Sequence, residues 1–83
     1  MGTFLVELYV ADGAAVARGV ELTRRAAEDL TRAGTPVRHL RSIFVPEDET
    51  CFFLYEAESA EAVDRAASES GLPYERVAAA VSS

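Results

Sequence analysis

The 83-residue sequence has one cysteine, Cys51, one histidine, His39, and no lysine among its eight basic residues. A single cysteine cannot form an internal disulfide bond or a thiolate metal cluster. The arginines are scattered and the net charge is −6, which argues against binding to a nucleic-acid backbone. No apolar run approaches the roughly 20 residues of a membrane span, so no membrane partner is expected.

The composition is that of a small globular domain. Hydrophobic residues make up 49% of the chain and charged residues 27%, which argues against disorder. The length leaves no room for a second core, so residues 1–83 are predicted to form one domain that gains stability from pairing. The N-terminal segment alternates in hydrophobicity and has no basic region, as expected of a strand in a cytoplasmic protein rather than of a signal peptide.

Six segments have a regular hydrophobic spacing. Four of them alternate or are rich in β-branched and aromatic residues, which predicts strands at residues 3–10, 37–45, 50–56 and 74–81. Two have helical spacing, at residues 14–33 and 60–70. Asp12 and Ser59 are suitable N-caps for these helices, and Gly34 and Gly71 are suitable stops.

The order of these segments predicts the fold. A β-α-β-β-α-β chain with right-handed crossovers forms an α+β, ferredoxin-like βαββαβ sandwich with an antiparallel sheet in the order 4-1-3-2. Both helices then lie on one face of the sheet. Two helices cannot cover both faces of four strands, so the second face is left open to solvent, a ligand or another subunit.

The turn at residues 46–49 sets the pairing of the two central segments. Closing the hairpin across this turn places Phe44 opposite Cys51, Leu40 opposite Tyr55, and Ser42 opposite Phe53. The same register pairs Arg41 with Leu54 and His39 with Glu56.

Alternation of side chains divides the sheet into two sets. We expect the helix-covered face to hold Phe4, Val6, Leu8, Val10, Leu40, Phe44, Cys51, Phe53, Tyr55 and Val77. We expect the open face to hold Leu5, Glu7, Tyr9, His39, Arg41, Ile43, Phe52, Leu54 and Glu56. Cys51 is then a core residue separated from His39, and Glu7 approaches Glu56 from a neighbouring strand.

Three interpretations of this polar patch follow from its residues. In a structural one, the open face packs against a second subunit, and Arg41 and His39 pair with the carboxylates. In a metal site, His39 with Glu56 and Glu7 binds a divalent ion such as nickel or zinc, with a dimer doubling the ligands. In a catalytic one, His39 and Glu56 act together as a general base and the group that orients it, and Tyr9 or Arg41 stabilises an oxyanion.

The sequence also resembles a known family. The segment at residues 37–77, VRHLRSIFVPEDETCFFLYEAESAEAVDRAASESGLPYERV, and the opening FLVELYV are similar to small bacterial ferredoxin-like proteins. Most members of that family have no known function, and some are described as nickel-binding. The resemblance implies a βαββαβ domain that is commonly dimeric, with a role in binding a divalent metal.

We therefore expect a non-catalytic homodimer that binds a divalent metal, nickel by resemblance, through His39, Glu56 and Glu7. Arg41 would balance charge, because a guanidinium cannot deprotonate to become a ligand. One alternative is a cofactor-free enzyme resembling the small dimeric monooxygenases of this architecture, which requires a pocket of about 300 Å³ or more. Another is an interaction module with a polar dimer interface.

Overall fold

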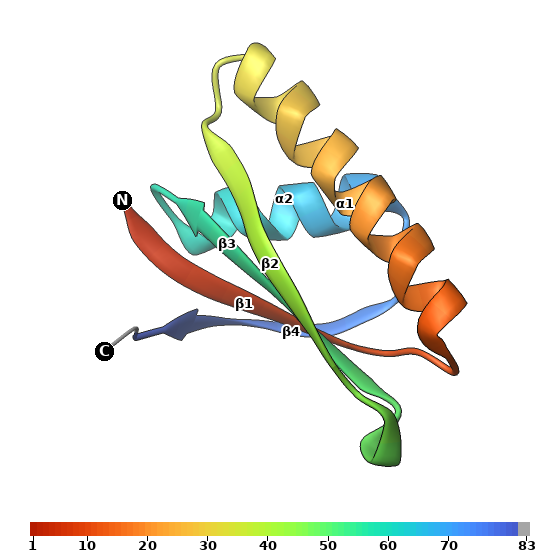
Figure 1. The fold of residues 1–83 in the computed structure, drawn as a ribbon. Coiled ribbons are helices and arrows are strands. Elements are labelled where there is room, and N and C mark those ends of the chain that lie inside the picture. Colours follow the sequence, from red (N-terminus) through yellow and green to blue (C-terminus); the bar gives the residue numbers. More distant parts are fainter. Residues whose placement is uncertain (82–83) are drawn as a thin grey trace.

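The computed structural model describes residues 1–81 as four strands and two helices (Figure 1). In chain order the elements are β1 (Gly2–Tyr9), α1 (Gly13–Arg32), β2 (Val37–Val45), β3 (Thr50–Ala57), α2 (Ala60–Ser70) and β4 (Tyr74–Ala80). A single 3₁₀ turn, Pro46–Asp48, joins β2 to β3. The last two residues of the predicted 1–83 domain lie outside the described residues. All six predicted segments are present, with ends that differ by one residue at most.

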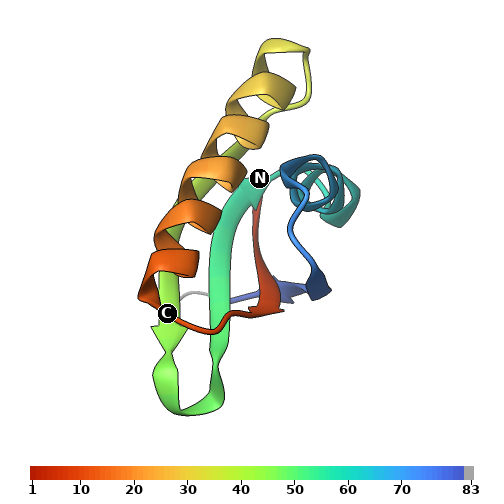
Figure 2. The ribbon, with the colours of Figure 1, turned by 90° about the vertical axis from the view of Figure 1, so that its right-hand side faces the viewer.

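The strands form one antiparallel sheet in the order β2-β3-β1-β4. This is the predicted 4-1-3-2 order, so the ferredoxin-like βαββαβ fold is confirmed. β2 and β4 are the edge strands, and α1 runs alongside β2 (Figures 1 and 2). Neither helix is long and apolar enough to cross a membrane, within the residues described.

The core lies between one face of the sheet and both helices (Figure 2). Its strand residues occupy alternate positions, as the pleat requires. The buried cluster consists of Val6, Leu8, Val37, Cys51, Phe53, Tyr55 and Ala57 from the sheet, and Ala27, Leu30, Ala62, Val63, Ala66 and Ala67 from the helices. The prediction that Cys51 is a core residue is confirmed, and burial raises the pKa of its thiol.

Both helices begin and end where the sequence provides caps. The Asp12 carboxylate accepts a hydrogen bond from the Ala15 backbone N–H at 2.9 Å, and the Ser59 hydroxyl accepts one from the Ala62 N–H at 3.2 Å. After α2, Gly71 adopts a left-handed φ of 76°, which a residue with a Cβ rarely does. These local signals explain why the predicted boundaries are accurate.

The pairing of β2 with β3 follows the predicted register from the turn as far as Arg41, which lies opposite Leu54. A β-bulge then shifts the register between His39 and Arg41. The predictions that Leu40 faces Tyr55 and that His39 faces Glu56 are therefore wrong. His39 lies opposite Tyr55 instead, and Leu40 has no partner in the ladder.

Burial explains why the bulge forms. With the bulge, Val37 pairs with Ala57 in the core and is only 4% exposed, while Arg38 pairs with Glu56 on the open face. A regular strand would turn the side chain of Val37 toward the open face and that of Arg38 under the helices. Burying an unpaired guanidinium there would cost several kcal/mol. The bulge avoids this cost by leaving Leu40 out of the strand pairing.

Candidate functional site

The open face of the sheet has an apolar centre. Register places Leu5 opposite Leu54 and Ile43 opposite Phe52, all pointing away from the helices. Ile43 remains 47% exposed. Arg41 also lies on this face, as predicted, beside Leu54. The face is therefore mostly hydrophobic, with charged side chains distributed around the apolar residues.

His39 does not belong to the open face. Because it pairs with Tyr55, it lies on the helix-covered side, where its ring packs edge-on against Phe53 and Tyr55 with centroids 5.7 Å away in each case. Its Nε2 atom is 3.0 Å from the Ser42 hydroxyl, within hydrogen-bonding distance. Burial lowers the pKa of His39, and the positive charge of Arg24 on α1 lowers it further, while a backbone hydrogen bond with Arg41 partly opposes them. The lowered pKa favours the neutral imidazole of His39, the form that binds metals.

Glu56 and Glu7 are each paired with an arginine that the sequence interpretation did not include. Arg38, which the bulge places where His39 was expected, lies 3.4 Å from the Glu56 carboxylate. Arg76 on β4 donates from Nε to Glu7 at 2.8 Å. The positions of these two arginines could be found only from the bulge and from the β1–β4 register, neither of which has a local sequence signal.

The two carboxylates are not adjacent. Glu56 lies opposite Thr3 on β1, whereas Glu7 lies opposite Phe52. Glu7 is therefore four residues along the strand from Glu56, a separation of about 13 Å. The prediction that these carboxylates share a patch with His39 is wrong, because the bulge moves His39 to the other face and strand pairing separates Glu7 from Glu56.

Within residues 1–81, no group of three or more His, Cys, Asp or Glu side chains is arranged to hold a metal ion. The roles of His39, Glu56 and Glu7 as metal ligands stay predictions. His39 and Glu56 do line the same pocket, and Glu7 does not.

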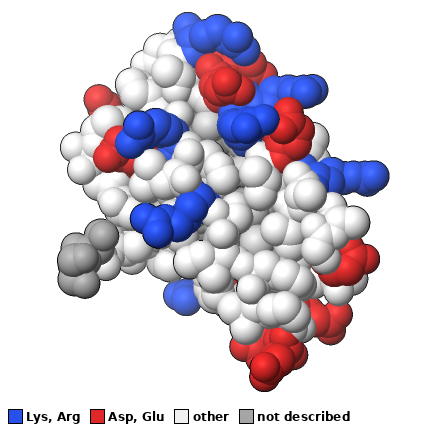
Figure 3. Space-filling view, viewed as in Figure 1, with Lys and Arg blue, Asp and Glu red and all other residues white. Residues whose placement is uncertain are grey.

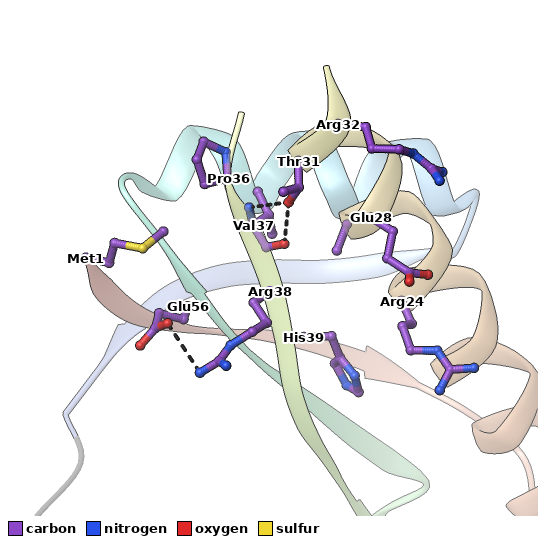
Figure 4. Close-up of a pocket in the computed structure, with 11 residues that line it drawn as sticks. Met1, Arg24, Glu28, Thr31, Arg32, Pro36, Val37, Arg38, His39 and Glu56 are labelled. Atoms are coloured by element: carbon purple, nitrogen blue, oxygen red, sulfur yellow. Dashed lines mark hydrogen bonds and ion pairs between the residues drawn. The ribbon is translucent and has the colours of Figure 1, made fainter. Parts of the chain in front are cut away.

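That pocket lies beside the edge strand β2, against α1, and has a volume of about 690 Å³ (Figure 4). It extends over both sides of the strand. On one side Arg38 reaches toward Glu56, and on the other His39 points toward Arg24 of α1. Glu28 of α1 adds a second carboxylate to the lining. We name this the α1–β2 pocket.

Comparison with known proteins assigns the chain to a family. The family model described as "Nickel responsive protein SCO4226-like" matches residues 4–79. The chain belongs to this family. The resemblance to small ferredoxin-like proteins is thereby confirmed.

The fold of this SCO4226-like chain is also found in a solved structure, titled as the crystal structure analysis of SCO4226 from Streptomyces coelicolor A3(2). The two share 18% sequence identity over 98% of each chain, with a TM-score of 0.78. Similarity at that identity concerns the fold alone. No curated protein matches the sequence significantly.

Proposed function

We propose that this SCO4226-like protein is a cytoplasmic homodimer that binds nickel and has no catalytic activity. Membership of a family described as nickel responsive, over residues 4–79, carries the proposal. A buried, unpaired thiol such as Cys51 is compatible with the reducing cytoplasm.

The α1–β2 pocket is the best location for the proposed metal. His39 lines it on the α1 side of β2 and Glu56 lines it on the other side of the strand, and a neutral imidazole and a carboxylate are both ligands that suit nickel among the divalent ions. Because the strand separates His39 from Glu56, and Glu7 is too far from Glu56 to share an ion with it, the other ligands of an ion at either residue would be water or groups from a second subunit. To bind the metal, Glu56 would have to give up its ion pair with Arg38. That 3.4 Å pair is exposed to solvent and therefore contributes little free energy.

The open face supports the homodimer. Leu5, Ile43, Phe52 and Leu54 form a continuous apolar centre on a face that neither helix covers. A chain of this length buries a modest core by itself, and packing two such faces together would remove that surface from water. Arg41 would then lie in the interface, with charged neighbours from the partner.

Nickel titration tests the binding. Isothermal titration of nickel into metal-free protein should show saturable binding that is weaker by about tenfold or more in His39→Ala, because one strong ligand is lost. Glu56→Gln should also weaken it. Glu58→Gln, two residues further on in the chain, is the matched control and should bind as the unaltered protein does.

The outcomes are separable. Full affinity in both His39→Ala and Glu56→Gln would exclude these ligands but leave nickel binding intact. Lack of binding by the unaltered protein to nickel, zinc, cobalt and copper alike would exclude the function.

A cofactor-free enzyme is the second candidate, and the α1–β2 pocket favours it. The volume of about 690 Å³ exceeds the roughly 300 Å³ that such an enzyme requires, and His39 could serve there as a base. The absence of substrate turnover in His39→Ala, in contrast to the unaltered protein, would support this candidate.

A further inference from the structure

A second pocket lies at the other end of α1, where the helix begins. The end of β1 with the loop that follows it, the first turns of α1 and the loop before β4 come together there (Figure 1), around a volume of about 430 Å³. The lining consists of residues 8–11, of Ala14, Ala15 and Arg18 on α1, and of residues 72–73. None of these residues lines the α1–β2 pocket. We name this the β1–α1 pocket.

The walls of the β1–α1 pocket are apolar. Apart from Arg18, its lining side chains belong to leucine, valine, alanine, proline and the single tyrosine Tyr9. Leu8 is only 1% exposed, and Val10 and Leu72 pack against the core, whereas Tyr9 remains 60% exposed. A concave apolar surface of this volume with one convergent charged group is the usual composition of a small-molecule site.

Hydrogen bonds hold both sides of the pocket in place. On one side the Val10 N–H donates to the Glu49 carbonyl at 2.9 Å, and on the other the Tyr74 N–H donates to the Leu72 carbonyl at 3.0 Å. The walls are therefore formed before a ligand arrives, and little conformational entropy would be lost when one binds.

Arg18 is the only charged residue that lines this pocket. Its side chain is exposed and forms no ion pair within residues 1–81, whereas Arg24, Arg32 and Arg38 are each paired with a carboxylate. In Figure 3 basic and acidic side chains lie next to one another around the end of α1, as those pairs require. Within the described part of the chain, the β1–α1 pocket thus has one positive charge that no carboxylate pairs with.

Acidic residues lie near the pocket but do not line it. Asp48 and Glu49 of the acidic β2–β3 turn line a smaller, adjoining cavity, which shares Tyr9, Val10 and Ala11 with the β1–α1 pocket. Their charges would repel a ligand that brought a second negative group toward that side. The surroundings therefore favour a singly charged ligand over a doubly charged one.

We propose that the β1–α1 pocket binds a small apolar molecule with one carboxylate, the carboxylate paired with Arg18 and the apolar body lying on Leu8, Val10 and Leu72. A guanidinium pairs with a carboxylate through two parallel N–H···O bonds, and apolar walls keep competing water away from them. This binding needs no metal and uses no residue of the α1–β2 pocket, so it goes beyond the proposed nickel binding.

Three ligands with the same ring system test the proposal by NMR of ¹⁵N-labelled protein in the presence of a chelator. With 2-naphthoate we expect saturable shifts centred on the amides of Val10, Ala14, Arg18 and Leu72. The neutral 2-naphthamide should bind about tenfold more weakly, because it lacks the charge. Naphthalene-2,6-dicarboxylate should bind about threefold more weakly or worse, because its second carboxylate would lie against apolar walls or toward the acidic turn.

Arg18 and Arg65 offer a matched pair of variants. Both are exposed helix residues without an ion pair within residues 1–81, but only Arg18 lines the pocket. Arg18→Gln should weaken naphthoate binding by about fivefold or more, and Arg18→Lys by less, because it keeps the charge but not the planar fork. Arg65→Gln changes the net charge equally and should leave binding unchanged. Circular dichroism checks that each variant is folded.

Each contrary result overturns the proposal. Absence of a saturable shift, shifts centred elsewhere, equal binding of the three ligands, or equal weakening by Arg18→Gln and Arg65→Gln would each do so. Shifts of the same amides on raising the protein concentration alone would show that a second copy covers the pocket, and would also overturn it. Because a chelator is present throughout, a failure here is distinct from a failure of nickel binding, which the metal titration measures separately.

Discussion

His39 lies opposite Tyr55 across β2 and β3, with their ring centroids 5.7 Å apart, because Leu40 is the extra residue of a β-bulge. This relationship moves the only histidine of the chain from the open face to the helix-covered one. It also leaves Arg38 as the partner of Glu56. The placement of Val37, Arg38 and His39 in the α1–β2 pocket follows from this one irregularity.

Deletion of the bulged residue should be tolerated. Removing Leu40 leaves Val37, Arg38 and His39 in their present pairs, so urea unfolding should show a loss of only about 1 kcal/mol. Deleting Ser42 instead would bring Leu40 into the ladder opposite Leu54 and move Arg41 opposite Phe53, under the helices, and burying that guanidinium should cost several kcal/mol. Equal losses in the two deletions would contradict the bulge.

His39 should make the protein less stable in mild acid. Its pKa is lowered in the folded state, mainly by burial and also by Arg24, whereas in the unfolded chain it is about 6.5. As pH falls below about 6.5, the unfolded chain takes up a proton first, so the free energy of unfolding falls until the folded pKa is passed.

The measurement is urea unfolding of metal-free protein at pH 7.5 and 5.5. The loss between these pH values should be smaller in His39→Gln, which has no group that titrates there. The carboxylates are common to both proteins and cancel in the comparison. An identical loss in the variant would mean that burial of His39 does not affect stability.

The Thr23 and Tyr55 hydroxyls form a buried hydrogen bond. Removing the Thr23 hydroxyl should destabilise the protein more than removing the Tyr55 hydroxyl. Burial raises the pKa of Tyr55 well above its usual range, so its hydroxyl stays protonated. Thr23→Val leaves the buried Tyr55 hydroxyl without a hydrogen-bond partner and should lower the free energy of unfolding by about 1–3 kcal/mol. Tyr55→Phe should cost less, because the threonine hydroxyl can turn to a carbonyl in the preceding helical turn.

A double-mutant cycle measures the coupling between the two residues. Thr23→Val combined with Tyr55→Phe removes both polar groups and should destabilise by less than the sum of the single variants. Chemical denaturation of the four proteins provides the values. Strict additivity would show that the two hydroxyls do not depend on each other.

Ile43→Lys should dissociate the proposed homodimer. Ile43 is 47% exposed at the apolar centre of the open face, and a lysine there would place a charge in the buried interface. Leu22→Lys is the matched control, because Leu22 is an exposed aliphatic residue on α1, away from the sheet. Sedimentation equilibrium should show monomers for Ile43→Lys alone, and a dimer that survives this change would place the interface elsewhere.

Much of the fold could be predicted because its signals are local. Strand alternation, the helical spacing of apolar residues and the caps Asp12 and Ser59 each depend on a few neighbouring residues, and the segments they predict are the ones observed. The hairpin register was correct from the turn to Arg41 because the turn length determines it. The burial of Cys51 followed from that register.

The candidate site was predicted less well, because it depends on contacts between distant residues. Glu7 and Glu56 lie on the predicted face, but only the β1–β3 register decides that they are four residues apart along the sheet. Arg76 on β4 donates to Glu7 on the neighbouring strand β1. The two residues are 69 positions apart in the chain, and no sequence spacing predicts such a contact.

The sequence by itself determined the elements, their order and the polarity of each strand, since these depend on local spacing and on the turn. Only the tertiary structure decided which face His39 occupies. Val37 had to be buried against the core and held by Thr31, and Arg38 had to reach solvent. Leu40 was displaced to satisfy both, because exposing one leucine costs less free energy than burying an arginine.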